Sequence, residues 1–106
     1  MDPDRARLPA VPKAYVICDI DVTDPEGYAG YRELSSKAGE KYGARFLVRG
    51  GATTVLEGDR QPARVVILQF DDVQAARRWY DSPEYQEAKA VRQSASTASF
   101  ILVEGV

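Results

Sequence analysis

The sequence contains no histidine and only one cysteine, Cys18, among its 106 residues. Without imidazole the chain cannot hold a histidine-ligated haem, a zinc site with nitrogen ligands or a catalytic triad that uses histidine. A single cysteine also excludes an internal disulfide. Any metal site would have to consist almost entirely of carboxylates, and the sequence has no acidic loop with suitable spacing. We therefore expect no metal and no cofactor.

An excess of positive charge and a long apolar run are also missing. The net charge is −2, which argues against nucleic acid or an anionic membrane as a partner. No apolar run is long enough to span a bilayer, and the N-terminus lacks the apolar core of a signal peptide, so we expect a cytoplasmic protein. The length is that of one domain with a small core, to which a partner subunit would add stability.

The hydrophobic pattern predicts one folded domain after a short tail. Residues 1–13 hold three prolines and alternating charges, and we expect a flexible tail there, followed by the domain over residues 14–106. Elements are predicted in the order strand, helix, strand, strand, helix, strand. The predicted strands span residues 15–22, 45–57 (with a kink at 50–51), 64–70 and 99–104. The predicted helices span about 24–43 and 72–92. The second helix is expected to break and restart at 82–83, and a polar linker is expected at 94–97.

The start of the first helix allows two caps. Thr23 would form a capping box with Glu26, or Asp24 would cap with Pro25 at the first helical position. Gly43 is expected to end this helix, because glycine readily takes the left-handed conformation of a helix C-terminus.

This order of elements predicts an α+β fold, a ferredoxin-like βαββαβ unit with a four-stranded antiparallel sheet and both helical segments on one face. The strand at 64–70 is apolar on both sides, and Tyr15 and Ile17 add apolar surface to the side without helices. A second copy packed sheet against sheet is the simplest cover. We therefore expect a homodimer, a dimeric α/β barrel, that encloses a cavity on the sheet face.

Several segments taken together resemble one known family. They are Phe46-Leu47-Val48-Arg49-Gly50-Gly51, Leu56-Glu57-Gly58, Ala76, Trp79-Tyr80, Ser82-Pro83-Glu84-Tyr85 and Arg92. They look like the pattern of the "domain of unknown function 1330" family, of the dimeric α/β-barrel superfamily, from about residue 15 to residue 106. The resemblance implies a ferredoxin-like protomer and a homodimer. Relatives in that superfamily include cofactor-free monooxygenases, lactone isomerases and haem proteins, and the haem members usually need an axial histidine that this chain lacks.

Two charged residues flank the predicted kink and are candidates for ligand binding. The guanidinium of Arg49 could hold the carboxylate of a small ligand, or it could pair with Glu57 or with an acid of a partner chain. Glu57 could act as a general base if burial raised its pKa, or it could be a surface acid.

Two aromatic residues complete the candidate set. Trp79 could line an aromatic pocket or pack in the core, and Tyr31 belongs to a helical stripe that serves a core or a ligand equally well. Arg92 could reach a ligand, clasp a second subunit or lie on a solvated helix face, and the sequence does not separate these. Cys18 is expected to be a buried, inert thiol.

Paired carboxylates and a nucleic-acid surface are weaker interpretations. Asp19 and Asp21 could share a proton or a cation, but such residues more often lie at the wet end of a half-covered sheet. The RNA-recognition motif shares this element order, but it needs exposed aromatic and basic residues on its central strands. The sequence thus indicates a homodimer that binds a small organic molecule, with anions among the candidates. A cofactor-free monooxygenase or isomerase and a purely structural or regulatory dimer are the alternatives.

Overall fold

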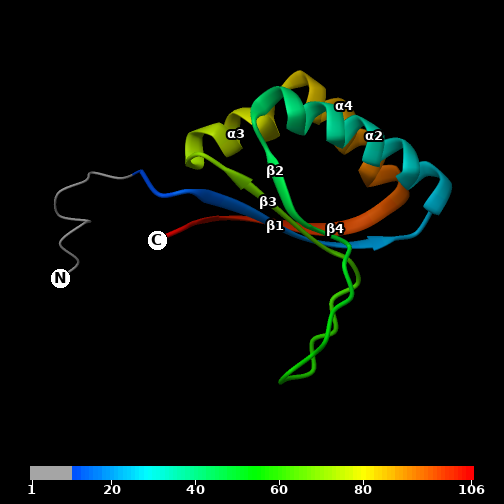
Figure 1. The fold of residues 1–106 in the computed structure, drawn as a ribbon. Coiled ribbons are helices and arrows are strands. Elements are labelled where there is room, and N and C mark those ends of the chain that lie inside the picture. Colours follow the sequence, from blue (N-terminus) through cyan, green and yellow to red (C-terminus); the bar gives the residue numbers. More distant parts are fainter. Residues whose placement is uncertain (1–10) are drawn as a thin grey trace, which may run out of the picture.

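The computed structural model describes residues 11–106, so the first ten residues of the predicted tail lie outside the described part. Seven elements follow one another in Figure 1: β1 (Ala14–Val22), α2 (Pro25–Tyr42), β2 (Arg45–Arg49), β3 (Val65–Phe70), α3 (Val73–Asp81), α4 (Pro83–Ala95) and β4 (Ser96–Glu104). None of the described helices is both long and apolar enough to cross a membrane.

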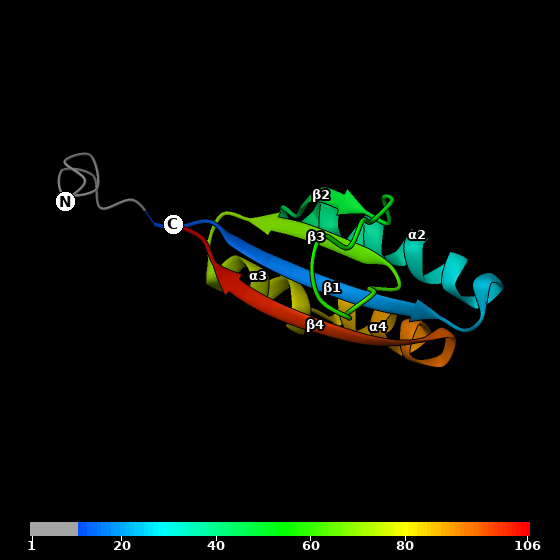
Figure 2. The same ribbon diagram turned by 90° about the horizontal axis from the view of Figure 1, so that it is seen from below.

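The four strands form one antiparallel sheet in the order β2-β3-β1-β4. The three helices lie together on one face of this sheet, and Figures 1 and 2 show no helix on the other face. The predicted ferredoxin-like α+β arrangement is therefore confirmed, with the second predicted helix present as the pair α3 and α4.

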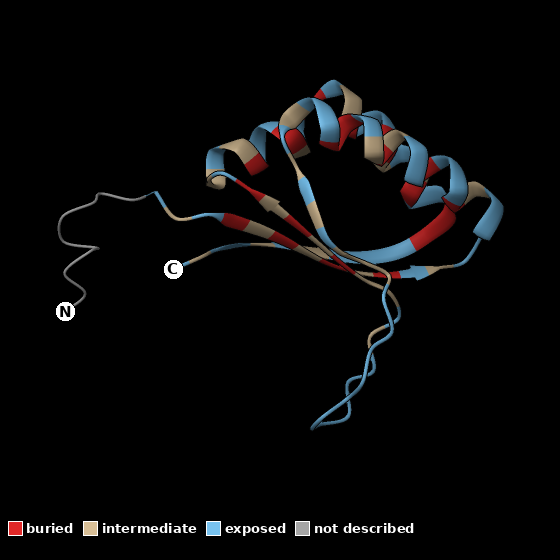
Figure 3. Ribbon diagram, viewed as in Figure 1, coloured by how far each residue is buried: buried red, intermediate tan, exposed pale blue. Residues whose placement is uncertain are grey.

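Strand β1 shows how the sequence positions the core. Its residues alternate between buried and more exposed positions, as period two requires of a sheet covered on one side. Val16, Cys18 and Ile20 face the helices and are buried, whereas Tyr15 and Ile17 face the other way and are only half-buried. The buried band between sheet and helices is visible in Figure 3.

The helix ends follow the predicted chemistry. Asp24 is the N-terminal cap residue of α2, with Pro25 at the first position, although the Asp24 side chain makes no capping hydrogen bond. Gly43 ends the helix with a φ of 77°, in the left-handed region. Between α3 and α4, the Ser82 hydroxyl accepts a hydrogen bond from the Tyr85 backbone N–H at 3.0 Å, so one serine ends one helix and starts the next.

Two predicted boundaries are wrong. The polar stretch 94–97 is not a linker, because α4 continues to Ala95 and β4 begins at Ser96, where it pairs with Val22 of β1. The second strand does not resume at residues 53–57, because β3 begins only at Val65 and offers no partner strand there. Residues 51–62, which we call the arm, instead project as an exposed loop from the sheet face opposite the helices (Figure 1).

Candidate functional site

Arg49 lies at the end of β2, but its side chain turns toward the helices rather than toward the arm. Its Nη2 donates hydrogen bonds to the backbone carbonyl of Arg32 (3.1 Å) and to the hydroxyl of Ser36 (2.8 Å), both on α2. Its guanidinium also stacks 4.1 Å from the centre of the Phe46 ring. The predicted pairing with Glu57 within the chain is wrong: Arg49 uses α2 instead, and Glu57 is exposed in the arm.

Arg32 lines the same cavity as Arg49, and the Arg64 guanidinium lies against Gly50, the residue that follows Arg49. We call Arg32, Arg49 and Arg64 the arginine cluster. Burial and then the charges of the other two arginines lower the pKa of Arg49. The Arg64 guanidinium lies 5.6 Å from the Tyr28 ring, and its buried Nε has no hydrogen-bond partner. Between residues 11 and 106, no carboxylate forms an ion pair with any member of the cluster. The cluster is therefore a local excess of positive charge in a chain whose net charge is negative.

A narrow cavity extends from Arg49 into the protein beneath α2. Its volume is about 10 Å³, and Cys18, Tyr28, Tyr31, Phe46 and Arg49 are among the residues that line it. A cavity of this size holds about one water molecule. It can therefore accept a single polar atom of a ligand, whereas a whole organic molecule would have to extend outward.

The interior next to this cavity is polar and contains a buried charge. The hydroxyls of Tyr31 and Tyr85 are 2.9 Å apart and join α2 to α4, and burial raises the pKa of both phenols. Arg92 is only 5% exposed, lies 4.2 Å above the Phe100 ring, and leaves its Nε without a partner. Cys18 belongs to the same layer, and burial raises the pKa of its thiol to about 12. With their pKa values raised, the two phenols and the thiol keep their protons at neutral pH, so they can donate hydrogen bonds but cannot act as bases.

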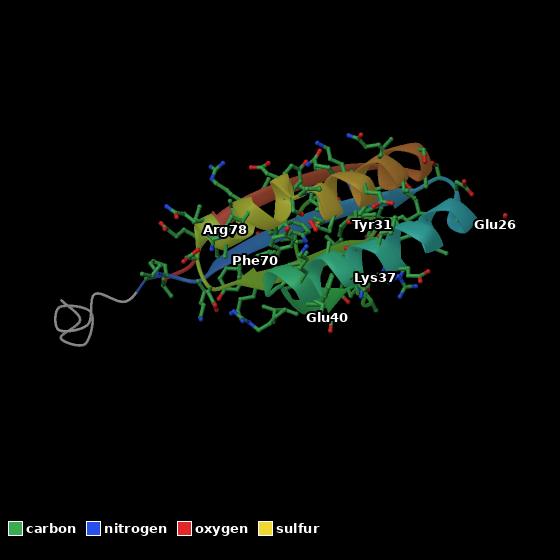
Figure 4. The ribbon with its side chains drawn as sticks, turned by 90° about the horizontal axis from the view of Figure 1, so that it is seen from above. Glu26, Tyr31, Lys37, Glu40, Phe70 and Arg78 are labelled. Carbon is green, nitrogen blue, oxygen red and sulfur yellow. The ribbon has the colours of Figure 1, made fainter. Side chains whose placement is uncertain are left out.

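Tyr31 of α2, which Figure 4 labels between α2 and α4, belongs to this layer. Trp79 is fully buried against Phe70, with ring centres 5.2 Å apart, and against Tyr85 at 4.2 Å, so the core-packing alternative describes its contacts. Of the four candidate residues, the structure brings Arg49 and Tyr31 to one cavity, links Trp79 to them through Tyr85, and leaves Glu57 apart.

The sequence interpretation left Arg92 open and did not single out Arg32 or Arg64. A solvated helix face is wrong for Arg92, which is buried. The signal was present: Tyr85, Ala88, Arg92 and Ala95 repeat at helical spacing, which puts position 92 on the buried stripe of α4. Arg64 had no such signal, because its position follows from the path of the chain after the arm.

The opposite sheet face carries a separate and larger hollow. A groove of about 560 Å³ lies between the sheet and the base of the arm, and Ile17, Val65 and Ile101 line its apolar part. At its rim, the Asp19 carboxylate accepts a hydrogen bond from the Ala63 N–H at 2.9 Å and lies 3.6 Å from the guanidinium of Arg60. Asp19 therefore fastens the arm to the sheet. None of the four candidate residues lines this groove.

Within residues 11–106 no group of three or more Cys, Asp or Glu side chains is arranged to hold a metal ion. A four-stranded antiparallel sheet with helices on one face and an uncovered apolar face defines an α+β protein of the ferredoxin-like class. The chain belongs to the family described as "Domain of unknown function (DUF1330)", which matches residues 13–106. No curated protein matches it significantly.

Solved structures share this fold at low sequence identity. RPA0582, a protein of unknown function from Rhodopseudomonas palustris, is 21% identical, with a TM-score of 0.74 over 90% of this chain and 83% of that one. A dimeric ferredoxin-like protein of unknown function from Thermobifida fusca is 15% identical, with a TM-score of 0.60 over 89% and 92% of the two chains. SnoaB, a cofactor-independent oxygenase from Streptomyces nogalater, is 17% identical, with a TM-score of 0.56 over 88% and 92%.

Proposed function

We propose that the protein is a homodimer that binds a small organic anion through the arginine cluster. The observation that carries this proposal is the convergence of Arg32, Arg49 and Arg64 without a carboxylate among the described residues. Guanidinium groups close together repel one another, and an anion placed among them replaces repulsion with charge-assisted hydrogen bonds. Arg32 and Arg49, which line the cavity, would supply the donors, and Arg64 would add positive charge beside them.

The size of the cavity limits the chemistry of the ligand. Since it holds about one water molecule, a carboxylate or similar oxyanion would place one oxygen near Arg49. The organic remainder would lie at the surface along the exposed side chain of Arg32. The best candidates are therefore small carboxylic acids with a compact negative group.

The homodimer is supported by the uncovered sheet face. Ile101 and Val103 of β4 are 59% and 42% exposed there, beside the partly buried Ile17. A face of this kind in a small domain is stabilised when a second sheet packs against it. The neighbour from Thermobifida fusca is described as dimeric.

Arg49→Met tests the anion site, because methionine keeps an unbranched stem over Phe46 and removes the charge. Losing one charge-assisted hydrogen bond costs about 1.5–3 kcal/mol, so affinity should fall roughly 10-fold to 150-fold. Calorimetric titration with acetate, oxalate and benzoate would measure this, with Arg78→Met, an exposed arginine of α3, as the matched control. Equal affinity in Arg49→Met and the wild type, or no binding of any of these acids by the wild type, would refute the proposal.

Cofactor-free oxygenation or isomerisation is a second candidate, supported by the described activity of SnoaB. The buried layer offers donors that would stabilise an enolate or phenolate, namely Tyr31, Tyr85 and Arg92. It offers no ionised base, so this activity would be limited to substrates that lose a proton on their own. Oxygen uptake by the wild type with a panel of acidic phenols, reduced in Tyr85→Phe, would support this activity. Uptake that is the same in Tyr85→Phe would contradict a role for the buried layer.

A further inference from the structure

The arm carries an apolar pair, Val55 and Leu56. Leu56 is 95% exposed and Val55 is 38% exposed. Within the arm, the Gln61 amide donates two long hydrogen bonds, to the Thr53 hydroxyl at 3.4 Å and to the Pro62 carbonyl at 3.5 Å, and neither involves the apolar pair. Both residues belong to the segment that projects away from the sheet (Figure 1), so their side chains are free to pack against another chain.

A groove of suitable chemistry lies at the opposite edge of the sheet, on the helix side. Its volume is about 300 Å³ between α3 and β4. Its apolar surface comes from Ala76, Phe100 and Leu102, and Arg77 and Asp81 stand at its rim. The groove therefore offers an apolar floor, with one cation and one carboxylate at its rim, to any segment that lies in it.

This groove is continuous with the uncovered sheet face. Ile101 of β4 lines both the α3–β4 groove and the larger groove on the sheet face. A second copy packed against the sheet face would therefore lie next to the α3–β4 groove. The arm of the same chain is poorly placed to use it, because the arm starts between β2 and β3, while β4 is at the other edge of the sheet.

The arm is long enough to reach across a partner. Packed sheets lie about 10 Å apart, and the six residues from Gly51 to Leu56 span up to about 20 Å when extended. The arm of one protomer projects toward the sheet of its partner and is long enough to extend past the edge of that sheet. Beyond this edge it would reach the helix side of the partner, where the partner's α3–β4 groove lies.

We propose that the arm of each protomer lies in the α3–β4 groove of the other, with Leu56 on the apolar floor and Glu57 beside Arg77. The occupant is thus a second copy of this chain, and two-fold symmetry makes the contact reciprocal. This inference rests on the homodimer of the proposed function, and it adds the partner segment and its docking site. It also gives Glu57, which has no ion-pair partner among residues 11–106, a cation opposite in charge.

Cross-linking between two singly substituted chains tests the contact. Chains bearing Leu56→Cys are mixed with chains bearing Arg77→Cys, allowed to exchange subunits, and oxidised. We expect a covalent heterodimer on non-reducing gels. A mixture of Leu56→Cys with Glu40→Cys, an exposed residue of α2 labelled in Figure 4, should give none. Cys18 is buried and does not interfere.

The dissociation constant of the dimer gives a second measurement that does not depend on disulfide geometry. Leu56→Ser should raise this constant at least ten-fold, because two leucines per dimer lose their buried contacts. Thr54→Ser, an exposed arm residue, should leave it unchanged. A stable dimer in which Leu56→Ser has no effect and Leu56→Cys does not cross-link would overturn the arm contact alone. A monomeric wild type would overturn the homodimer as well.

Discussion

Replacing Arg92 with methionine should make this protein more stable, although arginine is the residue that the fold contains. Arg92 is buried at 5% exposure, and no carboxylate among residues 11–106 pairs with it. Burying a charge costs several kcal/mol unless a partner compensates for it. Its unpartnered Nε adds a cost of about 1–3 kcal/mol for a hydrogen bond to water that is lost and not replaced.

The interactions that favour Arg92 are smaller. Its guanidinium lies 4.2 Å above Phe100 and 6.0 Å from the Tyr31 ring, and a desolvated cation–π contact contributes about 2 kcal/mol. Methionine keeps the apolar stem in the same layer and avoids the charge. The difference predicts that Arg92→Met raises the free energy of unfolding by about 1–4 kcal/mol, the range seen when a buried ion pair is replaced by apolar residues.

Urea unfolding followed by the fluorescence of Trp79, the single tryptophan, measures this difference. All variants are compared at one protomer concentration, because the stability of the proposed homodimer would depend on concentration. Arg78→Met, on the exposed surface of α3, should change stability by no more than about 0.5 kcal/mol. A loss of 2 kcal/mol or more in Arg92→Met would show that unrecognised acceptors satisfy the guanidinium and would refute the reasoning.

Three further predictions concern other contacts. Hydrogen bonds from Lys41 and Tyr42 lower the pKa of Glu84 to about 2. The wild type should therefore be more stable than Glu84→Gln above about pH 4.5, and urea unfolding should show this difference vanish as the pH falls toward 2. Burial raises the pKa of the Cys18 thiol to about 12, so in thiol labelling at pH 8 it should react only after unfolding, and reaction in the native state would contradict its burial. Gly50 has a φ of 75° and faces the Arg64 guanidinium, so Gly50→Ala should cost about 1–3 kcal/mol in urea unfolding, whereas Gly51→Ala, with open space around it, should be nearly neutral.

The sequence predicts the fold well because its local signals agree with the tertiary structure. The alternation in β1 and the Ser82-Pro83 helix start each depend on neighbours within a few residues. The linker predicted at residues 94–97 from their polar composition is wrong. Pairing of Ser96 with β1 outweighs the local preference of these residues for a loop. The prediction for residues 53–57 failed for the opposite reason. Their alternation suits a strand, but a strand needs a partner, and residues 11–106 provide none for this segment.

The candidate site was harder to predict because it depends on the face of the sheet toward which each side chain points. The sequence marks Arg49 as an unusual charge on an apolar strand, but its hydrogen bonds to α2 follow from a register shift in β2 between Phe46 and Val48. Arg64 joins it only because the chain returns to β3 after the arm. Contacts between residues far apart in the sequence leave no periodic signal.

The arm connects the two proposals. Arg49 is the last residue of β2, and Arg64 directly precedes β3, so these two arginines flank the segment that leaves and returns to the sheet. The Gly50 N–H donates to the Val65 carbonyl at 2.8 Å and closes the base of that segment. An anion held by both guanidiniums would therefore fix the base of the arm, while the tip of the arm lies on the partner. Because coupling between binding equilibria is reciprocal, an anion that strengthens the dimer must itself bind more tightly to the dimer than to the separated protomers, by the same factor.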